Sequence, residues 1–339
     1  MNIHTDISLK NYTTMRLGGR TRFMAEIHNP SELPEIYKNA QAQNLPIFIL
    51  GGGSNVIAND EDFNGLVLRN RIQGFEVLHE DTSSLTIKLG AGENWDDVVR
   101  RSVEMNLSGI EAMSAIPGTV GGCPVQNVGA YGQEIADTLQ SLEVYDSKTS
   151  NFKSLEASQC HFSYRDSIFR GPEMGRYFIT SVTLRLNKTS LQPPFYPALQ
   201  KYFDDNNVTI YTPATIREAV TKIRAEKLPN PKERPNTGSF FKNAIVEDWQ
   251  LKSLMEEYPD VPHFNMPDGR HKVPTGWLID KCELRGSLIS GMRVNDKNAL
   301  VLINESASSY QDLANARDQI IRAVRDKFRI EISQEPLEI

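Results

Sequence analysis

A glycine-rich loop near residue 50 has the composition of an anion-binding turn. The chain reads Leu50-Gly51-Gly52-Gly53-Ser54-Asn55 directly after the apolar run Ile47–Leu50. Consecutive glycines let the backbone bend and approach a ligand closely, and successive N–H groups can then surround an anion. The order of residues is neither the G-x-G-x-x-G fingerprint nor a P-loop. Taken alone, this loop is equally consistent with a tight connection after a strand.

A second loop, at residues 116–132, makes a ligand site the better interpretation. It reads IPGTVGGCPVQNVGAYG and has glycine at five positions. Such a segment is too rich in glycine for a helix or strand interior, and it is too apolar for a disordered linker. An ordered loop around a bound molecule accounts for both properties. Two such loops suit a long ligand with a diphosphate, such as a flavin dinucleotide.

Three further residues have side chains that could move a proton or hold charge. Ser239 lies in the run Thr237–Asn243, and its hydroxyl would need nearby cations or hydrogen bonds to act as an acid. Arg165 offers a planar fork that suits a carboxylate. Glu335 follows a strand-like run near residue 330. Each residue also has a purely structural alternative. Ser239 could be an ordinary serine in a glycine turn, Arg165 could form a structural ion pair, and Glu335 could be a solvated carboxylate in the tail.

Short β-like runs dominate the first half of the chain and are expected to position the loops. They are rich in β-branched and apolar residues and occur at residues 23–27, 47–50, 66–68, 85–89, 142–145 and 178–186. Helices are predicted at residues 31–43 and 93–105. The second of these places Trp95, Val98 and Val99 on one face.

The second half is more helical and begins after a proline-rich stretch at residues 187–197. Thr212 is expected to cap a helix that has Pro213 at its first position. Another helix is predicted from about Ser309 to Phe328, with Asp312 as its capping acid. A last strand is expected at Ile330–Ile332. The sequence therefore predicts a mainly β N-terminal part of about 190 residues and an α+β C-terminal part.

Composition excludes several classes of protein. The 339 residues have a formal net charge of -6, without the basic surplus that nucleic-acid binders usually show. Three widely spaced cysteines argue against a disulfide framework, and six histidines without ligand spacing predict no catalytic metal. The apolar runs are too short for a membrane span. We therefore expect a cytoplasmic protein that partners neither nucleic acid nor membrane.

The loops and several other short motifs, taken in order, resemble the UDP-N-acetylenolpyruvoylglucosamine reductase family, which has a flavin-binding domain of the vanillyl-alcohol-oxidase (PCMH) type. The resemblance runs from Asn11 to Pro336. Besides the two loops, its motifs are Asn11-Tyr12-Thr13-Thr14, Ala91-Gly92-Glu93-Asn94-Trp95, Tyr164-Arg165-Asp166-Ser167, Gly238-Ser239-Phe240-Phe241-Lys242-Asn243 and Gly276-Trp277-Leu278-Ile279-Asp280.

The resemblance implies an α+β fold in two parts. Residues 1–189 would form a two-lobed FAD-binding domain, with lobes at roughly 1–68 and 69–189. Residues 190–339 would form a UDP-sugar-binding domain whose last strand returns to the first lobe. FAD would be non-covalent, since no histidine lies in or beside either loop. Its binding residues would be Gly51, Gly52, Gly53, Ser54, Asn55, Ile116, Pro117, Gly118, Thr119, Gly121, Gly122, Asn127, Gly129 and Ala130.

The implied reaction is reduction of UDP-N-acetylglucosamine enolpyruvate by NADPH, catalysed by a monomer. Ser239 matches the family's proton donor, Arg165 the residue at the substrate carboxylate, and Glu335 the residue that helps stabilise the enol. The substrate-binding positions would be Tyr164, Tyr196, Lys227 and Asn243. Two alternatives remain open on the sequence: an FAD-dependent oxidase or dehydrogenase of small alcohols, and a non-enzymatic protein that binds a nucleotide sugar or flavin.

Overall fold

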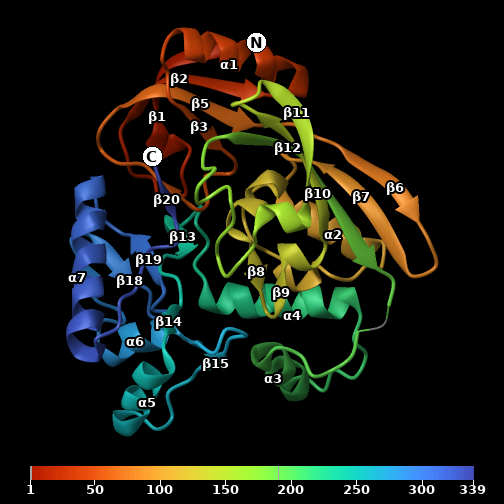
Figure 1. Ribbon diagram of the computed structural model, residues 1–339. Helices are drawn as coiled ribbons and strands as arrows, with labels where there is room; N and C mark the ends of the chain where they lie inside the picture. Colours follow the sequence, from red (N-terminus) through yellow and green to blue (C-terminus); the bar gives the residue numbers. More distant parts are fainter. Residues whose placement is uncertain (1, 190) are drawn as a thin grey trace. The chain divides into compact units, whose positions relative to one another are not determined.

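The chain divides into two units, each assembled from separate segments of the sequence (Figure 1). The computed structural model describes residues 2–189 and 191–339. Unit 1 contains Met1–Ile7, Thr21–Gly53 and Phe63–Ala225, and unit 2 contains Ser8–Arg20, Ser54–Asp62 and Glu226–Ile339. Residues 191–225, expected in the C-terminal domain, thus belong to unit 1. Met1 and Ser190, where the two expected domains begin, lie outside the described residues.

The first sheet of unit 1 is built around parallel strands. Its order is β1 (Ile3–Ser8), β2 (Arg20–Ile27), β5 (Phe63–Asn70) and β3 (Ile47–Leu50), and β5 runs parallel to both β2 and β3. Helix α1 (Leu33–Ala42) supplies the crossover from β2 to β3, which lie on the two sides of β5. The sheet and α1 bury a shared core that includes Ile27, Ile36 and Leu68.

The second sheet of unit 1 is antiparallel. Its order is β11 (Asn151–Glu156), β10 (Leu139–Asp146), β12 (Tyr177–Asn187), β7 (Ser84–Gly90) and β6 (Phe75–Glu80). Helix α2 (Trp95–Glu104) packs Trp95, Val98 and Val99 into the core of this sheet, as the sequence predicted. The Asn94 side chain caps α2 by accepting a hydrogen bond from the Asp97 N–H at 3.1 Å.

Helices α3 (Pro197–Asp205) and α4 (Pro213–Lys227) complete unit 1 and share a small core. Ile216 and Val220 of α4 pack with Leu199 and Phe203 of α3. The predicted Thr212 cap is confirmed, because its hydroxyl accepts a hydrogen bond from the Thr215 N–H at 3.2 Å.

Most of unit 2 is formed by a four-stranded sheet, a three-stranded sheet and the α-helices that pack with them. One sheet has the order β13 (Asn236–Ser239), β19 (Val301–Asn304), β18 (Met292–Val294) and β17 (Leu288–Ile289), and the other has β14 (Ala244–Val246), β16 (His271–Val273) and β15 (Phe264–Asn265). The helices are α5 (Asp248–Glu257), α6 (Thr275–Lys281) and α7 (Tyr310–Phe328). The predicted cap of α7 is confirmed, because Ser309 and Asp312 form a capping box.

The end of the chain differs from the predicted strand at residues 330–332. Arg329 adopts a left-handed conformation with φ 58° and terminates α7, and Ile330 and Ile332 then pack in the unit 2 core without joining a sheet. Burial of apolar side chains, the signal behind the prediction, does not require a hydrogen-bonded neighbour. The last strand is β20 (Leu337–Glu338), which pairs in parallel with β4 (Val56–Ile57).

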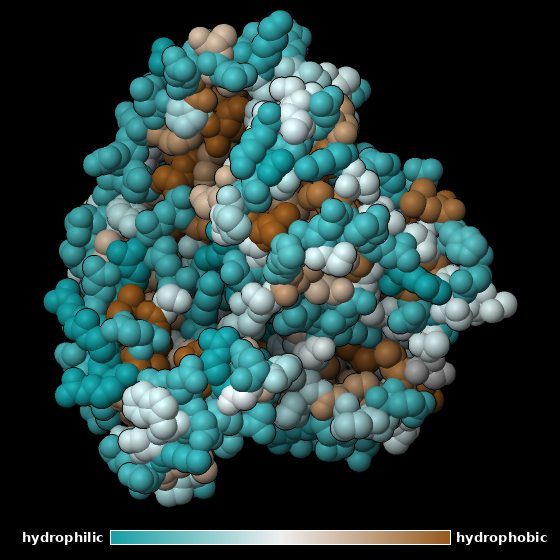
Figure 2. All heavy atoms as spheres, in the orientation of Figure 1, coloured by the Kyte–Doolittle hydropathy of each residue, from teal (hydrophilic) through white to brown (hydrophobic). Residues whose placement is uncertain are grey.

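The face of the molecule shown in Figure 2 is mainly hydrophilic, with hydrophobic residues in scattered groups. Scattered exposed apolar residues are normal for a protein surface. In the described part of the chain, none of the helices is long and apolar enough to cross a membrane. All three cysteines are free thiols, with Cys123 and Cys160 buried.

Candidate active site

The two glycine-rich loops of unit 1 touch one another. A Cβ atom added at Gly51 would lie 2.5 Å from Oγ1 of Thr119, and one added at Gly52 would lie 2.9 Å from Cα of Gly118. Separations this short exclude a side chain at either position unless a neighbour moves. The glycines after β3 are therefore needed for the close approach of the second loop.

The second loop is fixed against the segment that leads into α2. The N–H of Trp95 donates to the Gly118 carbonyl at 3.1 Å, and the N–H of Gly121 donates to the Ala91 carbonyl at 2.8 Å. An added Cβ at Gly121 would lie 2.7 Å from Cβ of Ala91. The motif Ala91–Trp95 thus serves as the seat of the glycine loop.

Several N–H groups of these loops have no acceptor in the part of the chain that the structure describes. Within the described residues, the N–H groups of Gly51, Gly52, Gly53, Gly118 and Thr119 donate no hydrogen bond. Backbone donors are normally satisfied, and unpaired ones converging at a loop favour an anionic ligand. The contacting loops therefore fit the diphosphate of a dinucleotide such as FAD.

The other predicted cofactor residues differ in their surroundings and in the unit to which they belong. Ile116 packs against the core of unit 1, and a Cβ added at Gly122 would meet only Oγ1 of Thr119, at 3.6 Å. Ser54 and Asn55 belong to unit 2, where the Ser54 carbonyl accepts a hydrogen bond from the Thr14 hydroxyl at 3.5 Å.

A tight hairpin follows the second loop. Strands β8 (Gly129–Ala130) and β9 (Gln133–Glu134) are joined by Tyr131 and Gly132, whose φ values are 49° and 88°. Two central residues with positive φ are typical of a two-residue hairpin turn. Asn127, also left-handed, donates from Nδ2 to the Glu134 carboxylate at 2.7 Å and fixes the approach to the hairpin.

Arg165 reaches this hairpin from a strained turn. Ser163 and Asp166 are bridged backbone to backbone, so Tyr164 and Arg165 form the tip, and Arg165 has a φ of 55°. Its Nη2 donates to the Gly129 carbonyl at 2.7 Å. Its Nη1 donates to the Asn127 carbonyl at 3.4 Å. The Tyr164 ring lies 5.4 Å from the same guanidinium.

Tyr196 lies against the turn of the same hairpin. Its ring makes an edge-to-face contact with the Tyr131 ring, with centroids 5.8 Å apart. Burial raises the pKa of both phenols, so both remain neutral at physiological pH. The structure thus brings Arg165 and Tyr196 to one loop of unit 1. Tyr131 was not singled out from the sequence, although it lies in the Gly-rich loop.

Ser239 ends strand β13 of unit 2. The pairing of β13 with β19 is irregular between Asn236 and Ser239, and Gly238 adopts a φ of 72° there. The Asn236 side chain holds the irregularity by accepting from the Gly238 N–H at 2.8 Å and donating to the Arg234 carbonyl at 2.7 Å. An irregular strand end can turn a side chain out of the sheet pattern, a device common near active sites.

Glu335 is held directly beside the Ser239 segment. Its N–H donates to the Phe240 carbonyl at 2.8 Å, and the Lys242 N–H donates to the Ser333 carbonyl at 2.9 Å. Phe241 and Gln334 form a bridge between these two bonds. The tail is therefore docked, and it places Glu335 next to the residue that follows Ser239.

The two residues before Ser239 provide an unpaired hydroxyl group and unoccupied space. The Thr237 Oγ1 is buried without a hydrogen-bond partner, and a Cβ added at Gly238 would meet no atom within 4 Å. A buried hydroxyl without a partner in the protein is usually explained by a hydrogen bond to a ligand or a water molecule. Thr237 was not predicted as a site residue, and the sequence holds no signal that distinguishes it from other threonines.

Asn243 and Lys227 have structural contacts as well. The Asn243 Oδ1 accepts a hydrogen bond from the Thr275 N–H at 3.2 Å at the start of α6. Lys227 is the exposed last residue of α4, and its carbonyl accepts from Nδ2 of Asn295 at 3.1 Å. These contacts do not test the substrate-binding roles predicted for the two side chains.

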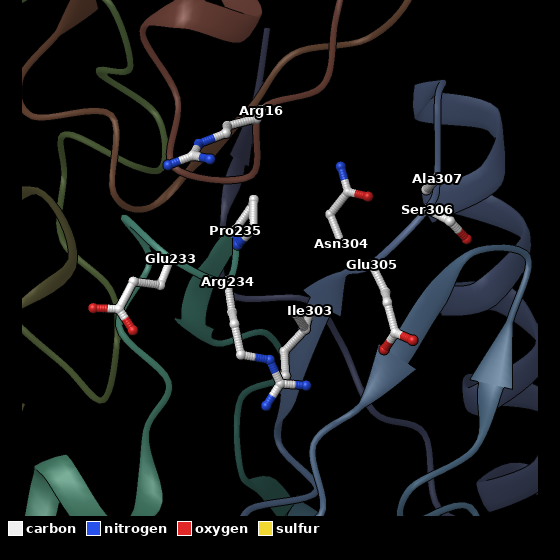
Figure 3. A pocket seen from close by; sticks show the side chains of 9 residues that line it. All are labelled: Arg16, Glu233, Arg234, Pro235, Ile303, Asn304, Glu305, Ser306 and Ala307. Carbon is white, nitrogen blue, oxygen red and sulfur yellow. The ribbon is translucent and has the colours of Figure 1, made fainter.

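An open cavity of about 440 Å³ also lies in unit 2 (Figure 3). In that view the Arg234 side chain extends between Glu233 and Glu305, and Arg16 lies apart from them. Arg16 donates to the Lys232 carbonyl at 2.5 Å, and Glu305 is held by both Nε and Nη2 of Arg293. The mixed charges give no preference for an anion or a cation, and the lining contains none of the predicted site residues.

No cluster of three or more metal-ligating side chains occurs among the residues that the structure describes. The predicted site residues fall into two groups. Unit 1 carries Arg165, Tyr164, Tyr196 and the contacting loops, and unit 2 carries Ser239, Glu335, Asn243, Lys227, Ser54 and Asn55.

Two family models match the chain. An FAD binding domain matches residues 21–152, and the C-terminal domain of UDP-N-acetylenolpyruvoylglucosamine reductase matches residues 230–339. Both regions contain residues described above, including the contacting glycine loops in the first and Ser239 and Glu335 in the second.

Relatives that match over nearly the full length carry the same name as the second family model. The chain is 35% identical to a UDP-N-acetylenolpyruvoylglucosamine reductase of Burkholderia multivorans, over 99% of this chain and 97% of that protein. It is 37% identical to one of Dechloromonas aromatica, over 99% of both chains. The solved structure of the Thermus caldophilus enzyme has the same fold, with a TM-score of 0.69 at 22% identity, covering 100% of this chain and 99% of that one.

Proposed function

Since the chain belongs to the UDP-N-acetylenolpyruvoylglucosamine reductase family, we propose that it uses NADPH to reduce UDP-N-acetylglucosamine enolpyruvate to UDP-N-acetylmuramate. Membership makes it a flavoprotein oxidoreductase of peptidoglycan synthesis with FAD as cofactor and a nucleotide sugar as substrate. It favours this activity over both a small-alcohol oxidase and a non-enzymatic binding protein. The proposed reaction reduces a carbon–carbon double bond, with NADP as the partner couple.

The docking of the tail beside Ser239 carries the proposal. Reduction of an enolpyruvyl group requires a proton at the carbon next to the carboxylate, and Ser239 is the proposed donor. The hydrogen bond from the Glu335 N–H to the Phe240 carbonyl, at 2.8 Å, holds the Glu335 backbone beside the residue that follows Ser239, which supports a role for the Glu335 carboxyl group. That carboxyl group would assist the reaction by stabilising the enol intermediate, to which Ser239 would donate the proton.

Unit 1 would supply the binding groups. The five unpaired N–H groups of Gly51, Gly52, Gly53, Gly118 and Thr119 would hold the FAD diphosphate. Bound FAD supplies hydride transfer from NADPH. The guanidinium of Arg165 would orient the substrate carboxylate and offset the negative charge that develops beside it. The side chains proposed to bind the substrate are those of Tyr164, Tyr196, Lys227 and Asn243.

The matching regions of the two family models support the functional division expected from the sequence. We propose that residues 1–189 bind FAD and that residues 190–339 bind the UDP sugar. We also propose that the protein acts as a monomer, which sedimentation equilibrium at micromolar concentration would check.

An anaerobic absorbance titration tests the activity. NADPH should bleach the flavin band of the purified protein, and the enol ether should then restore it with stoichiometric loss of the double bond. A reduced flavin that only oxygen reoxidises would overturn the assignment as a reductase.

Replacing Ser239 by alanine tests the proton donor. Bleaching by NADPH should keep its rate, because this half needs no proton from Ser239. Recovery with the enol ether should slow by about 10²- to 10⁴-fold, the usual contribution of a positioned general acid. Ser306→Ala, an exposed serine of the same unit, serves as the matched control and should keep both rates. Equal rates in Ser239→Ala and the control would remove Ser239 from the mechanism.

A further inference from the structure

The segment that carries Glu335 lies between the end of α7 at Phe328 and strand β20, outside the regular elements. The Glu335 N–H donates to the Phe240 carbonyl at 2.8 Å. The next residue, Pro336, has no N–H. The main chain therefore offers no donor directly after Glu335, and side chains are the remaining means of restraining the turn there.

The Gln334 side chain closes this turn across Glu335. Its Nε2 donates to the Pro336 carbonyl at 3.2 Å and to Oε1 of Glu338 at 2.9 Å. The amide thus connects the residue before Glu335 with the residue after it. Local hydrogen bonds from a side chain to the main chain stabilise a turn in place of regular structure.

Arg317 of helix α7 holds the Gln334 amide from outside the turn. Its Nη1 donates to Oε1 of Gln334 and to Oε1 of Glu338, both at 2.8 Å. The Tyr310 hydroxyl donates to the same Glu338 oxygen at 2.8 Å. One nitrogen of Arg317 therefore fixes a residue on each side of Glu335.

The charge of Arg317 is satisfied within unit 2. Its Nε donates to Oδ1 of Asp318 at 2.8 Å, and its Nη1 forms the ion pair with Glu338. Its side chain is only 19% exposed. A guanidinium that is paired with two carboxylates is suited to holding protein groups in place, and it has little capacity to bind an anionic ligand.

Helix α7 is a firm base for Arg317. The Asp60 carboxylate accepts from the N–H groups of Tyr310 and Gln311 at the start of the helix, at 2.7 and 3.1 Å. Ile320 and Val324, in the turns that follow Arg317, are fully buried in the unit 2 core. The position of Arg317 is therefore set by the fold and not by the tail.

We propose that Arg317 is a positioning residue, which directs the Glu335 side chain through Gln334 and makes no contact of its own with the substrate. The inference rests on the proposed function, in which the Glu335 carboxyl group stabilises the enol. A catalytic group that is displaced by about 1 Å can lose a factor of about 10² in rate, so a restraint on the turn around Glu335 bears directly on turnover.

Substitutions at both ends of the Arg317–Gln334 hydrogen bond test the proposal. Arg317→Met removes the donors and keeps an unbranched side chain that favours a helix, and Arg317→Lys keeps a charge and one reach towards the tail. Gln334→Met removes the amide and leaves Arg317 in place. Arg322→Met is the matched control, since Arg322 is exposed on the same helix and donates to the Asp318 carbonyl at 3.3 Å.

Stopped-flow absorbance follows the two half-reactions separately. Arg317→Met and Gln334→Met should slow reoxidation of the flavin by the enol ether about 10- to 100-fold. Flavin reduction by NADPH should keep its rate, and so should the affinity of the oxidised protein for the enol ether. Arg317→Lys should give an intermediate rate of reoxidation, and Arg322→Met should match the unchanged protein.

A double-mutant cycle separates positioning from a general structural role. In a Glu335→Gln protein, Arg317→Met should cause little further loss, because the group that Arg317 directs is already absent. A loss of the same size in both backgrounds would overturn the proposal. Equal slowing of both half-reactions, a weaker affinity for the enol ether as the sole change, or an unchanged rate of reoxidation would overturn it as well.

Thermal unfolding establishes that each variant is folded at the assay temperature. Arg317→Lys and Gln334→Met carry the comparison if Arg317→Met is not. Failure of the proposed function would appear differently, in the unchanged protein, as a flavin that NADPH does not bleach or that the enol ether does not reoxidise.

Discussion

Asp146 has a carboxylate that solvent does not reach, at the end of β10. Arg176 binds both of its oxygens, at 2.8 and 2.7 Å, and Lys153 approaches to 2.9 Å. These contacts, led by the hydrogen bonds from Arg176, hold the pKa of Asp146 well below its ordinary value of 3.8. The stabilisation is therefore complete above the unfolded pKa and is lost as the pH falls towards the folded one.

Asp146→Asn should lower the free energy of unfolding by about 2 kcal/mol at pH 7. The figure lies below the 3–5 kcal/mol typical of breaking a fully buried pair, because Arg176 and Lys153 keep contact with water. The difference from the unchanged protein should shrink as the pH falls from about 4 to 2. Urea unfolding at several pH values measures it. Asp205→Asn, in an exposed pair with Lys201, should change stability by less than about 0.5 kcal/mol, and a pH-independent deficit in Asp146→Asn would contradict the account.

At the residue scale, the sequence predicted the functional candidates that belong to recognisable motifs. Arg165, Ser239 and Glu335 could be named because each lies in a short motif with a family resemblance. Thr237 could not be named, because the property that distinguishes it is a buried hydroxyl without a hydrogen-bond partner in the folded protein. Satisfaction of hydrogen bonds depends on neighbours distant in sequence, which residue type and spacing do not reveal.

At the scale of the elements, the glycine loop at residues 116–122 contains two adjacent glycines, Gly121 and Gly122. The space around their Cα atoms differs, so they can be compared. A Cβ at Gly121 would lie 2.7 Å from Cβ of Ala91, whereas a Cβ at Gly122 has its nearest neighbour at 3.6 Å. The two glycines lie in the same short 3₁₀ helix, Val120–Gly122, and neither needs a positive φ. They therefore differ mainly in the space around them.

Gly121→Ala should destabilise the ligand-free protein by about 1–3 kcal/mol, the typical effect of overpacking. It should also weaken FAD binding, because the loop would shift from its seat on Ala91. Gly122→Ala should change both quantities much less. Calorimetry of the two apoproteins and FAD fluorescence titrations provide the comparison, and similar behaviour of the two variants would show that the seat on Ala91 does not position the loop.

The elements themselves could be largely predicted from periodicity. The strand expected at residues 47–50 forms at Ile47–Leu50, and the helix expected at residues 309–328 forms at Tyr310–Phe328 with Ser309 as its cap. The strand predicted at residues 330–332 was wrong because burial of Ile330 and Ile332 occurs there without a sheet. The pairing of β20 with β4 could not be read from local pattern, since each strand has only two residues.

At the scale of the whole molecule, bound FAD should act as a stabilising ligand. A ligand that binds only the folded protein adds RT ln(1 + [L]/Kd), which is about 2.7 kcal/mol at a free concentration of 100 Kd. Differential scanning calorimetry of the apoprotein with increasing FAD should show a rising unfolding midpoint, and riboflavin, which lacks the diphosphate, is the control. Equal effects of FAD and riboflavin would mean that the unpaired N–H groups of the glycine loops do not bind the diphosphate.

The segmented make-up of unit 2 has a consequence for synthesis on the ribosome. Met15, Leu17 and Ile57 belong to a core whose other members come from residues 240–332, and β4 pairs with the strand at Leu337–Glu338. Val56 and its partner Leu337 are 281 residues apart (337 − 56), so at translation rates of about 5–20 residues per second Val56 waits roughly 14–56 s for this partner. Throughout that interval the apolar side chains of these early residues are open to chaperones and to other nascent chains. The yield of folded protein in a cell should therefore depend on the speed of translation more strongly for this arrangement than for one built from consecutive segments.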